Sequence, residues 1–136
     1  MITKLDHIAI AVADIEEASR FYTELLGLKV TGVEELPKEQ VKVAFIPVGD
    51  TRIELVQPLS DESPISKFLE KRGQGLHHLC FRSDDIQHDL TTIVDSGARV
   101  LDREPRNGSH NSKIAFVHPK SNTGVLTELS QPSTKP

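Results

Sequence analysis

The chain has 136 residues, of which 37% are hydrophobic and 26% charged, and its formal net charge is −4. This size and composition predict one soluble globular domain with a sizeable core, and the mildly acidic charge argues against a nucleic-acid partner. No apolar run is long enough to span a membrane, and Met1–Asp6 enter a strand-like pattern that leaves no room for a signal peptide. A single cysteine, Cys80, excludes an internal disulfide and suits a reducing compartment, so we expect a cytoplasmic protein.

The first half of the chain predicts one strand, one helix and three further strands. Residues 4–12 alternate and predict a strand, and Asp14 and Gly27 have the residue types that begin and end a helix. The apolar stripe expected on this helix is Ile15, Ala18, Phe21, Leu25 and Leu26. Strands are predicted at 28–34, 41–48 and 51–57, the last two joined by a Gly49-Asp50 turn.

The second half predicts the same series of elements. After a linker at 59–75, with a short helix at 64–71, a strand begins near residue 76. A helix at 85–96 stops at Gly97 and is followed by strands at 98–104, 112–118 and 124–131. Its inward residues are expected to be Ile86, Leu90, Ile93 and Val94. The pattern is an α+β chain of two βαβββ modules within one domain, 1–136, with module one at about 1–58 and module two at about 76–132.

An internal repeat relates the two modules. The segment Leu5-Asp6-His7-Ile8-Ala9-Ile10 matches Leu76-His77-His78-Leu79-Cys80-Phe81 at a spacing of 71 residues, and residues 42–46 match 113–117 at the same spacing. Glu54-Leu55 then matches Glu128-Leu129 at a spacing of 74. One three-residue insertion in the last hairpin of the second copy explains the change. Several blocks in one register indicate a duplicated module.

The repeat presents one histidine and one glutamate twice. Strand side chains alternate between faces, so His7 and Glu54 are expected on the face opposite the apolar residues that pack under the helix. The repeat gives His78 and Glu128 the same placement. Two imidazoles and two carboxylates that converge would hold one divalent metal ion, Co²⁺, Ni²⁺, Mn²⁺ or Zn²⁺, and leave about two coordination positions for a bidentate substrate.

A structural role is the alternative for each of these residues taken alone. A histidine near the start of a strand is usually structural, and a glutamate in a strand usually faces solvent. His77 shows that a histidine in such a strand need not be a ligand, because strand parity and the repeat both assign it away from the site. The recurrence of His and Glu at equivalent positions in both modules favours the metal site.

These residues resemble those of the vicinal oxygen chelate (glyoxalase-like) superfamily, and within it the methylmalonyl-CoA epimerase family. The resemblance runs from Asp6-His7-Ile8 to Glu128-Leu129, and its most specific stretches are Asp61-Glu62-Ser63-Pro64-Ile65, Gly75-Leu76-His77-His78, His118-Pro119-Lys120 and Gly124-Val125-Leu126-Thr127-Glu128-Leu129. It implies a curved, mostly antiparallel eight-stranded sheet around the metal, with His7, Glu54, His78 and Glu128 as ligands. Some epimerases have Gln in place of Glu54.

The resemblance also implies a reaction and a substrate. The expected activity is epimerisation of (2R)- and (2S)-methylmalonyl-CoA by proton abstraction at C2 through a metal-stabilised enolate. Glu128 is the first candidate base and Glu54 a further one, alongside a bound water or a loop residue. Some epimerases carry a glutamate base where this chain has Val43, which cannot move a proton.

A basic rim is expected to bind the phosphates of coenzyme A, with Lys120, Lys113 and Arg106 as its candidate residues. Ordinary surface charges are the alternative for these three side chains. The segment 106–111 is expected to close over the substrate. The resemblance also suggests a homodimer in which each chain holds a whole site.

Three other functions stay open at this point. A lactoylglutathione lyase would use the same ligand set on a glutathione hemithioacetal. A non-catalytic member that binds a small molecule commonly lacks some of the four ligands, whereas this chain has all four. An extradiol-type dioxygenase is disfavoured by the complete ligand set and by the few aromatic residues, five Phe and one Tyr.

Overall fold

The structure is a computed structural model that describes residues 1–133. The chain forms two compact units, one of His7–His77 and one that joins Met1–Asp6 to the chain from His78 onward. Strand β1 (Ile2–Ala11) therefore contributes to both units, and the eight strands within residues 1–133 follow the order β2-β3-β4-β1-β5-β8-β7-β6. Within residues 1–133, no helix combines the length and the apolar character needed to cross a bilayer.

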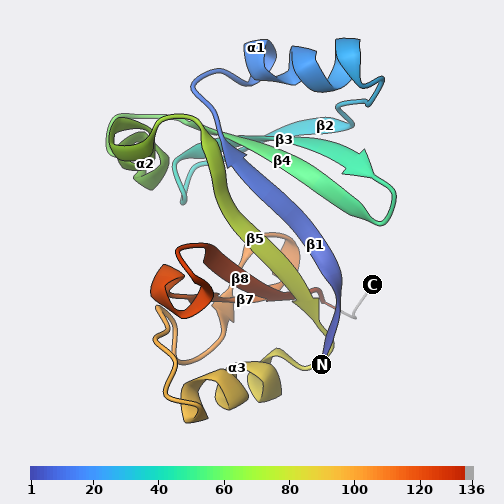
Figure 1. Cartoon of the computed structure of the whole chain (residues 1–136). Helices are drawn as coiled ribbons and strands as arrows, with labels where there is room; N and C mark the ends of the chain where they lie inside the picture. The colour runs from blue at the N-terminus through green and yellow to red at the C-terminus, as the bar shows by residue number, and fades with distance from the viewer. Residues whose placement is uncertain (134–136) are drawn as a thin grey trace. The chain divides into compact units, whose positions relative to one another are not determined.

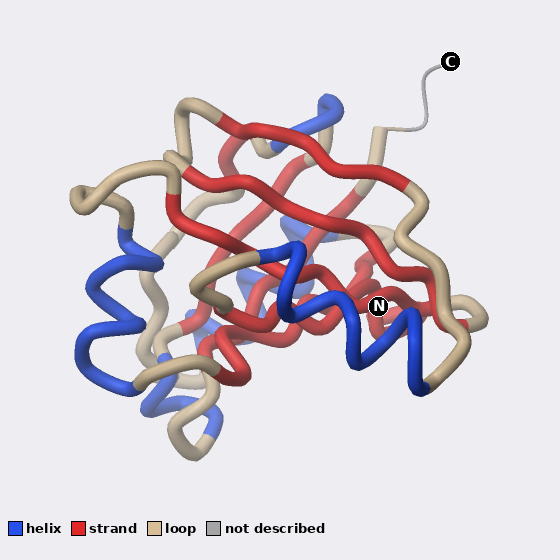
Figure 2. Tube along the Cα trace, turned by 90° about the horizontal axis from the view of Figure 1, so that it is seen from above, coloured by secondary structure: helices blue, strands red, loops and turns tan. Residues whose placement is uncertain are grey.

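The unit His7–His77 contains the first set of strands and three helical segments. Its elements after β1 are α1 (Ile15–Arg20), the π-helical η1 (Phe21–Leu25), β2 (Gly32–Leu36), β3 (Val41–Val48), β4 (Thr51–Pro58) and α2 (Pro64–Arg72). Strands β2, β3 and β4 are antiparallel neighbours, and β1 pairs with β4 in parallel. Helix α1 lies along one side of these strands (Figure 1), which run side by side in Figure 2.

Both faces of this first set of strands are covered by apolar contacts. One face packs against α1 through the buried residues Val12, Ile15, Ala44, Ile46 and Leu55. The other face packs in part against Ile65 of α2, through Ala9, Ala11, Val41, Val43 and Val56. Strand alternation puts His7 and Glu54 on this second face, beyond the part that α2 covers.

The second unit repeats the arrangement. Its elements are β5 (Gly75–Ser83), whose first residues belong to the other unit, α3 (Ile86–Asp95), β6 (Arg106–Asn107), the 3₁₀ turn η2 (Ser109–Asn111), β7 (Lys113–Val117), the 3₁₀ turn η3 (Pro119–Asn122) and β8 (Leu126–Gln131). Strand β5 pairs with β8 in parallel, and β6, β7 and β8 are antiparallel neighbours. The core under α3 is Ile86, Leu90, Ala115 and Leu129, with Ile93 and Val94 packed against it.

The predicted α+β chain of two βαβββ modules is confirmed, and the helix limits are set by the expected residues. Asp14 caps α1 by accepting a hydrogen bond from the Glu16 amide, and Asp85 caps α3 by accepting one from the His88 amide. Gly27 and Gly97 follow the helices with φ of 72° and 86°, a left-handed conformation that glycine adopts without strain.

The two strands predicted directly after the helices are wrong in their bounds. Strand β2 begins only at Gly32, because Leu28 N–H still donates to the Tyr22 carbonyl at 2.9 Å and so belongs to the helix end. At 98–104 there is only an isolated bridge at Val100, and β6 is confined to 106–107. The Asp102 carboxylate accepts the Phe116 N–H at 2.9 Å, so a side chain takes the place of a strand partner there.

The apolar stripe predicted for the first helix is also wrong in its second half. Phe21 is 54% exposed and Leu25 is 74% exposed, whereas Tyr22 packs on the core. Phe21 lies off the stripe because the helical spacing of Ile15 and Ala18 continues at Tyr22. For Leu25 the cause is the π-helical turn η1, in which Leu26 N–H donates to the Phe21 carbonyl at 3.3 Å. An i→i+5 turn contains an extra residue, so every later side chain changes its direction relative to an α-helix.

Candidate metal-binding site

His7 and Glu54 lie together in the unit His7–His77, as strand parity predicts. His7 Nδ1 is 3.3 Å from Glu54 Oε2, and the two side chains are 8% and 12% exposed. The strand register explains the contact, because Glu54 of β4 pairs with Ala9 of β1, two residues beyond His7 on the same face. A nearly buried imidazole and carboxylate at this separation provide two of the donor atoms that a first-row divalent metal prefers.

Arg52 contacts both members of this pair, and sequence reasoning missed it. Its Nε donates to Glu54 Oε2 at 2.7 Å, and its Nη2 is 3.5 Å from His7 Nδ1. The guanidinium also lies over the Phe45 ring, with 5.8 Å from Cζ to the ring centroid. The signal was present in the sequence, because residues 52 and 54 of one strand must share a face.

His78 and Glu128 form the equivalent pair in the second unit. His78 Nε2 is 3.0 Å from Glu128 Oε1, and the side chains are 12% and 11% exposed. Glu128 pairs in register with Cys80 of β5 and Phe116 of β7, and the Phe116 ring meets the His78 ring edge-on at 5.6 Å. The internal repeat therefore reproduces a His–Glu pair of similar spacing and burial in each unit.

The position expected to hold a base in some family members is closed to that role in this chain. Val43 lies in the apolar cluster that includes α2 and is 3% exposed. It pairs in register with Val56 and Glu34 on the neighbouring strands. A buried apolar side chain cannot accept a proton.

The three candidate phosphate-binding residues lie at different places in the second unit. Arg106 of β6 lies over the Phe116 ring at 5.7 Å and donates to Asp102 at 3.2 Å. Lys113 begins β7 and donates to Asn107 at 2.6 Å, but its parity in the strand is opposite to that of Phe116. Lys120 lies in η3, between β7 and β8.

The turn that holds Lys120 is organised by a neutral histidine. His118 Nδ1 accepts the Lys120 N–H at 3.0 Å, which an imidazole does only when that nitrogen carries no proton. Desolvation lowers the pKa of His118 from its ordinary value of 6.5, and the positive charges of Arg99 and Lys120 lower it further. His118 is therefore neutral near pH 7 and holds η3 together.

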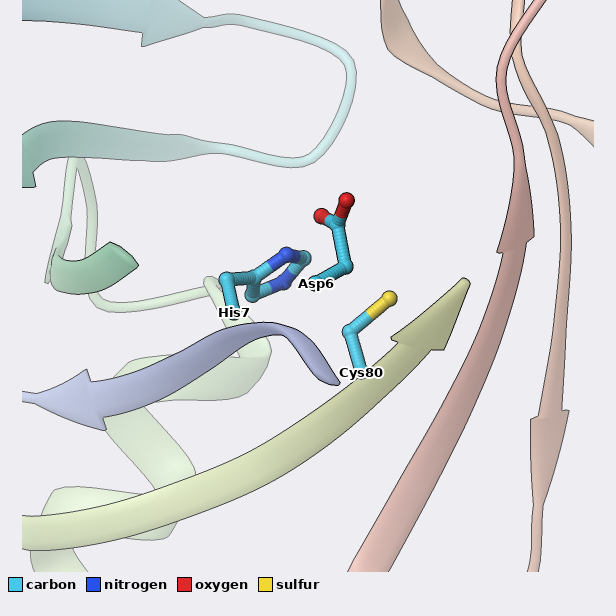
Figure 3. Close-up of side chains that lie close together, drawn as sticks. All are labelled: Asp6, His7 and Cys80. Carbon is cyan, nitrogen blue, oxygen red and sulfur yellow. The ribbon is translucent and has the colours of Figure 1, made fainter. Parts of the chain in front are cut away.

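A buried group near the start of β1 was also missed. Arg82 donates to Asp6 Oδ1 through Nε at 3.1 Å and Nη2 at 2.8 Å, and Asp6 is 5% exposed. Cys80 lies close to Asp6, and Figure 3 shows the two side chains together with that of His7, the next residue of β1. Because the Asp6 carboxylate already accepts two bonds from one guanidinium, we interpret this group as an ion pair that fixes β1 against β5.

Comparison with known proteins shows the family of the chain. The Glyoxalase/Bleomycin resistance protein/Dioxygenase superfamily matches residues 6–116. An ethylmalonyl-CoA/methylmalonyl-CoA epimerase of Cereibacter sphaeroides is 43% identical over 96% of the chain and 99% of its own length. The mitochondrial methylmalonyl-CoA epimerase of Mus musculus is 41% identical over 94% of the chain and 72% of its own length.

Solved structures agree with these relatives. A Streptomyces coelicolor methylmalonyl-CoA epimerase variant in complex with 2-nitronate-propionyl-CoA superposes with a TM-score of 0.88 at 35% identity, and each chain is covered in full. By contrast, a probable lactoylglutathione lyase of Synechocystis is 29% identical over 95% of both chains.

Proposed function

Because the chain belongs to the Glyoxalase/Bleomycin resistance protein/Dioxygenase superfamily, we propose that it is a metal-dependent methylmalonyl-CoA epimerase. The observation that carries the proposal is the match of epimerases at 41% and 43% identity along nearly the whole chain. The substrate class has separate support, because a relative of the same fold binds a coenzyme A thioester that carries a nitronate next to the thioester carbon. That group resembles the planar, negatively charged state that proton removal from C2 would produce.

The two His–Glu pairs would together hold one divalent metal ion. Each pair brings an imidazole and a carboxylate together, with the nearest nitrogen and oxygen 3.3 Å apart in one unit and 3.0 Å apart in the other. His7, Glu54, His78 and Glu128 would thus be the four protein ligands, a donor set that suits Co²⁺, Ni²⁺, Mn²⁺ or Zn²⁺. When bound, the metal supplies positive charge to the substrate oxygens on which negative charge develops, which is worth several kcal/mol.

Proton transfer at C2 would use carboxylates of this chain. Glu128 takes the C2 proton from one face of the substrate, the carbon becomes planar, and a second group returns a proton to the opposite face. No net charge or electron is gained, because one proton leaves and one returns. Val43 cannot be the second base, and Glu54 is the candidate among the proposed metal ligands.

Binding of the coenzyme A portion is assigned to the basic residues of the second unit. Arg106 has the strongest support, because it lies over Phe116, which pairs in register with Glu128. Lys120 would add a positive charge at η3, and Lys113 would contribute at the edge of the β6–β7 hairpin. A guanidinium forms two parallel hydrogen bonds to a phosphate, whereas a lysine acts as a point charge.

Assembly as a homodimer in the cytoplasm completes the proposal. Each chain carries both modules, so each chain of a dimer would hold a complete site. Light scattering after gel filtration measures the mass, and a value near 15.1 kDa at working concentration would exclude the dimer.

The decisive experiment is deuterium incorporation at C2 of methylmalonyl-CoA in heavy water. The protein is assayed after dialysis against a chelator and again after addition of Co²⁺, Mn²⁺, Ni²⁺ or Zn²⁺ singly. We expect exchange and epimerisation that depend on the metal. No exchange with any of the four ions would overturn the proposal. Turnover of the hemithioacetal of methylglyoxal and glutathione, without exchange of methylmalonyl-CoA, would assign the chain as a lyase.

A further inference from the structure

The side chain of Arg52 is arranged around a single oxygen of Glu54. Both Nε and Nη2 of Arg52 lie 2.7 Å from Glu54 Oε2. The third group near the same oxygen is His7 Nδ1, at 3.3 Å. In the described part of the chain, the side-chain hydrogen bonds and ion pairs of Glu54 involve Oε2, so Oε1 is the oxygen that faces away from Arg52 and is offered to another ligand.

This ion pair differs from an ordinary surface salt bridge in its burial and its register. The Glu54 side chain is 12% exposed and that of Arg52 is 33% exposed, so the pair is shielded on one side. Arg52 pairs with His7 across β1 and β4, and Glu54 pairs with Phe45 across β3 and β4, where the Phe45 ring lies beneath the guanidinium. Stacking on Phe45 and the strand register limit the rotamers of Arg52. Its side chain therefore loses less conformational entropy when it binds Glu54.

The internal repeat shows that an arginine at this position occurs in the first module and not in the second. At the spacing of 74 residues that relates Glu54 to Glu128, the equivalent of Arg52 is Leu126. A leucine side chain has no hydrogen-bond donor. The two His–Glu pairs therefore have similar separations, but only the first has a guanidinium at this position.

We infer that Arg52 is a positioning residue that presents Oε1 of Glu54 to the metal and so makes the two halves of the site unequal. This inference rests on the metal site of the proposed function. A hydrogen bond to the outer oxygen of a ligating carboxylate fixes its rotamer, and loss of such a partner typically lowers metal affinity about 10- to 100-fold. The guanidinium also adds one positive charge beside the Glu54 carboxylate, which favours a substrate that carries a free carboxylate.

The test compares Arg52→Gln, Arg52→Lys and the unchanged protein. The matched control is Arg20→Gln, at an exposed residue of α1. Circular dichroism checks the fold, and titration calorimetry and the visible spectrum of bound Co²⁺ report on the site without reference to turnover. We expect Arg52→Gln to bind Co²⁺ about 10- to 100-fold more weakly with an altered spectrum. Arg52→Lys should recover part of the affinity, because a lysine keeps the charge but not the fixed fork. Arg20→Gln should match the unchanged protein.

The outcomes separate this inference from the proposed function. Equal Co²⁺ affinity and spectrum in Arg52→Gln and the unchanged protein would overturn the inference and leave the epimerase proposal intact. If Arg52→Gln does not fold, Arg52→Lys decides, and an affinity equal to that of the unchanged protein would overturn the inference. If the unchanged protein binds none of the four ions, the metal site of the proposed function is overturned first and the inference falls with it.

Discussion

Replacement of Glu128 by Gln tests whether this residue transfers a proton or only holds the metal. The amide has nearly the same volume and keeps a carbonyl oxygen that can ligate, so the nearly buried site beside His78 should retain its packing. The amide cannot act as a base. General-base catalysis typically contributes about 10²- to 10⁴-fold, which corresponds to about 2.7–5.5 kcal/mol of transition-state stabilisation. We expect turnover to fall within this range, while metal content falls far less.

The assay follows each stereoisomer of methylmalonyl-CoA separately in heavy water, by NMR for exchange at C2 and by coupled turnover for epimerisation. If Glu128 serves one face of the substrate, Glu128→Gln should lose exchange from one isomer and retain part of it from the other, with epimerisation lost in both directions. Metal content is measured on the same samples. Glu39→Gln, in the exposed turn before β3, serves as the control and should behave as the unchanged protein.

Glu54→Gln is the matching substitution in the first module, because Glu54 is the repeat equivalent of Glu128. Because some epimerases have Gln at this position, we expect a loss of about tenfold if Glu54 is only a ligand. A loss as large as that of Glu128→Gln, on the opposite isomer, would instead identify Glu54 as the second base. The reasoning about Glu128 would be refuted if its substitution removed metal and turnover in parallel, because the residue would then act only as a ligand.

Three further predictions concern binding and stability. Arg106→Gln should raise KM for the coenzyme A thioester about tenfold with little change in kcat, because one charge-assisted contact to the substrate is lost. An unchanged KM would show that Arg106 does not bind the substrate. Leu90→Ala should destabilise the second unit by about 2–5 kcal/mol in urea titrations, because Leu90 of α3 is fully buried against the strands, and a loss under 1 kcal/mol would contradict that packing. The hydrogen bond to Asp84 raises the pKa of the Met1 ammonium from 8.0, and the same bond lowers the pKa of the Asp84 carboxyl from 3.8. The Met1–Asp84 ion pair thus stabilises the fold between these two pKa values, and this stabilisation is lost as pH rises through the raised pKa or falls through the lowered one. Asp84→Asn should therefore lower Tm only within this pH window. An equal loss of Tm at pH 10 would refute this prediction.

The elements that could be predicted from the sequence are those with a local cause. The β3–β4 hairpin was predicted at 41–48 and 51–57 and lies at Val41–Val48 and Thr51–Pro58, because Gly49-Asp50 makes the turn between two β-rich runs. The linker helix was predicted at 64–71 and lies at Pro64–Arg72, where Ser63 caps it and Pro64 begins it. Each of these features depends on neighbours within a few residues.

The features that sequence reasoning missed depend on hydrogen bonds that carry no periodic signal. The π-helical turn η1 redirects Leu25 toward solvent, although its spacing from Ala18 is that of an apolar α-helical stripe. The Asp102 carboxylate substitutes for a strand partner at the Phe116 amide, although the segment 98–104 has a strand-like composition. In both cases one hydrogen bond changes the conformation of a segment whose residue pattern is unchanged.

The His–Glu pairs could be predicted because a duplication gives two independent readings of one pattern. Strand parity alone leaves a histidine and a glutamate with several ordinary roles, and their recurrence at His78 and Glu128 removes most of these. In the structure, His7 Nδ1 lies 3.3 Å from Glu54 Oε2, and His78 Nε2 lies 3.0 Å from Glu128 Oε1. That the two pairs share one metal remains a prediction, which the ion titrations test.

The same duplication explains why the chemistry of the site was harder to predict than its ligands. A search for internal similarity finds what the two modules have kept in common, and it does not report what the residues found in only one module do. The differences lie at positions where the repeat fails: Arg52 faces Glu54 whereas Leu126 takes its place in the second module, and Ala9 is replaced by the buried Cys80. Departures from the repeat on the ligand face are therefore the positions at which functional roles should be sought, and Arg52 is the departure that contacts both predicted ligands of its module.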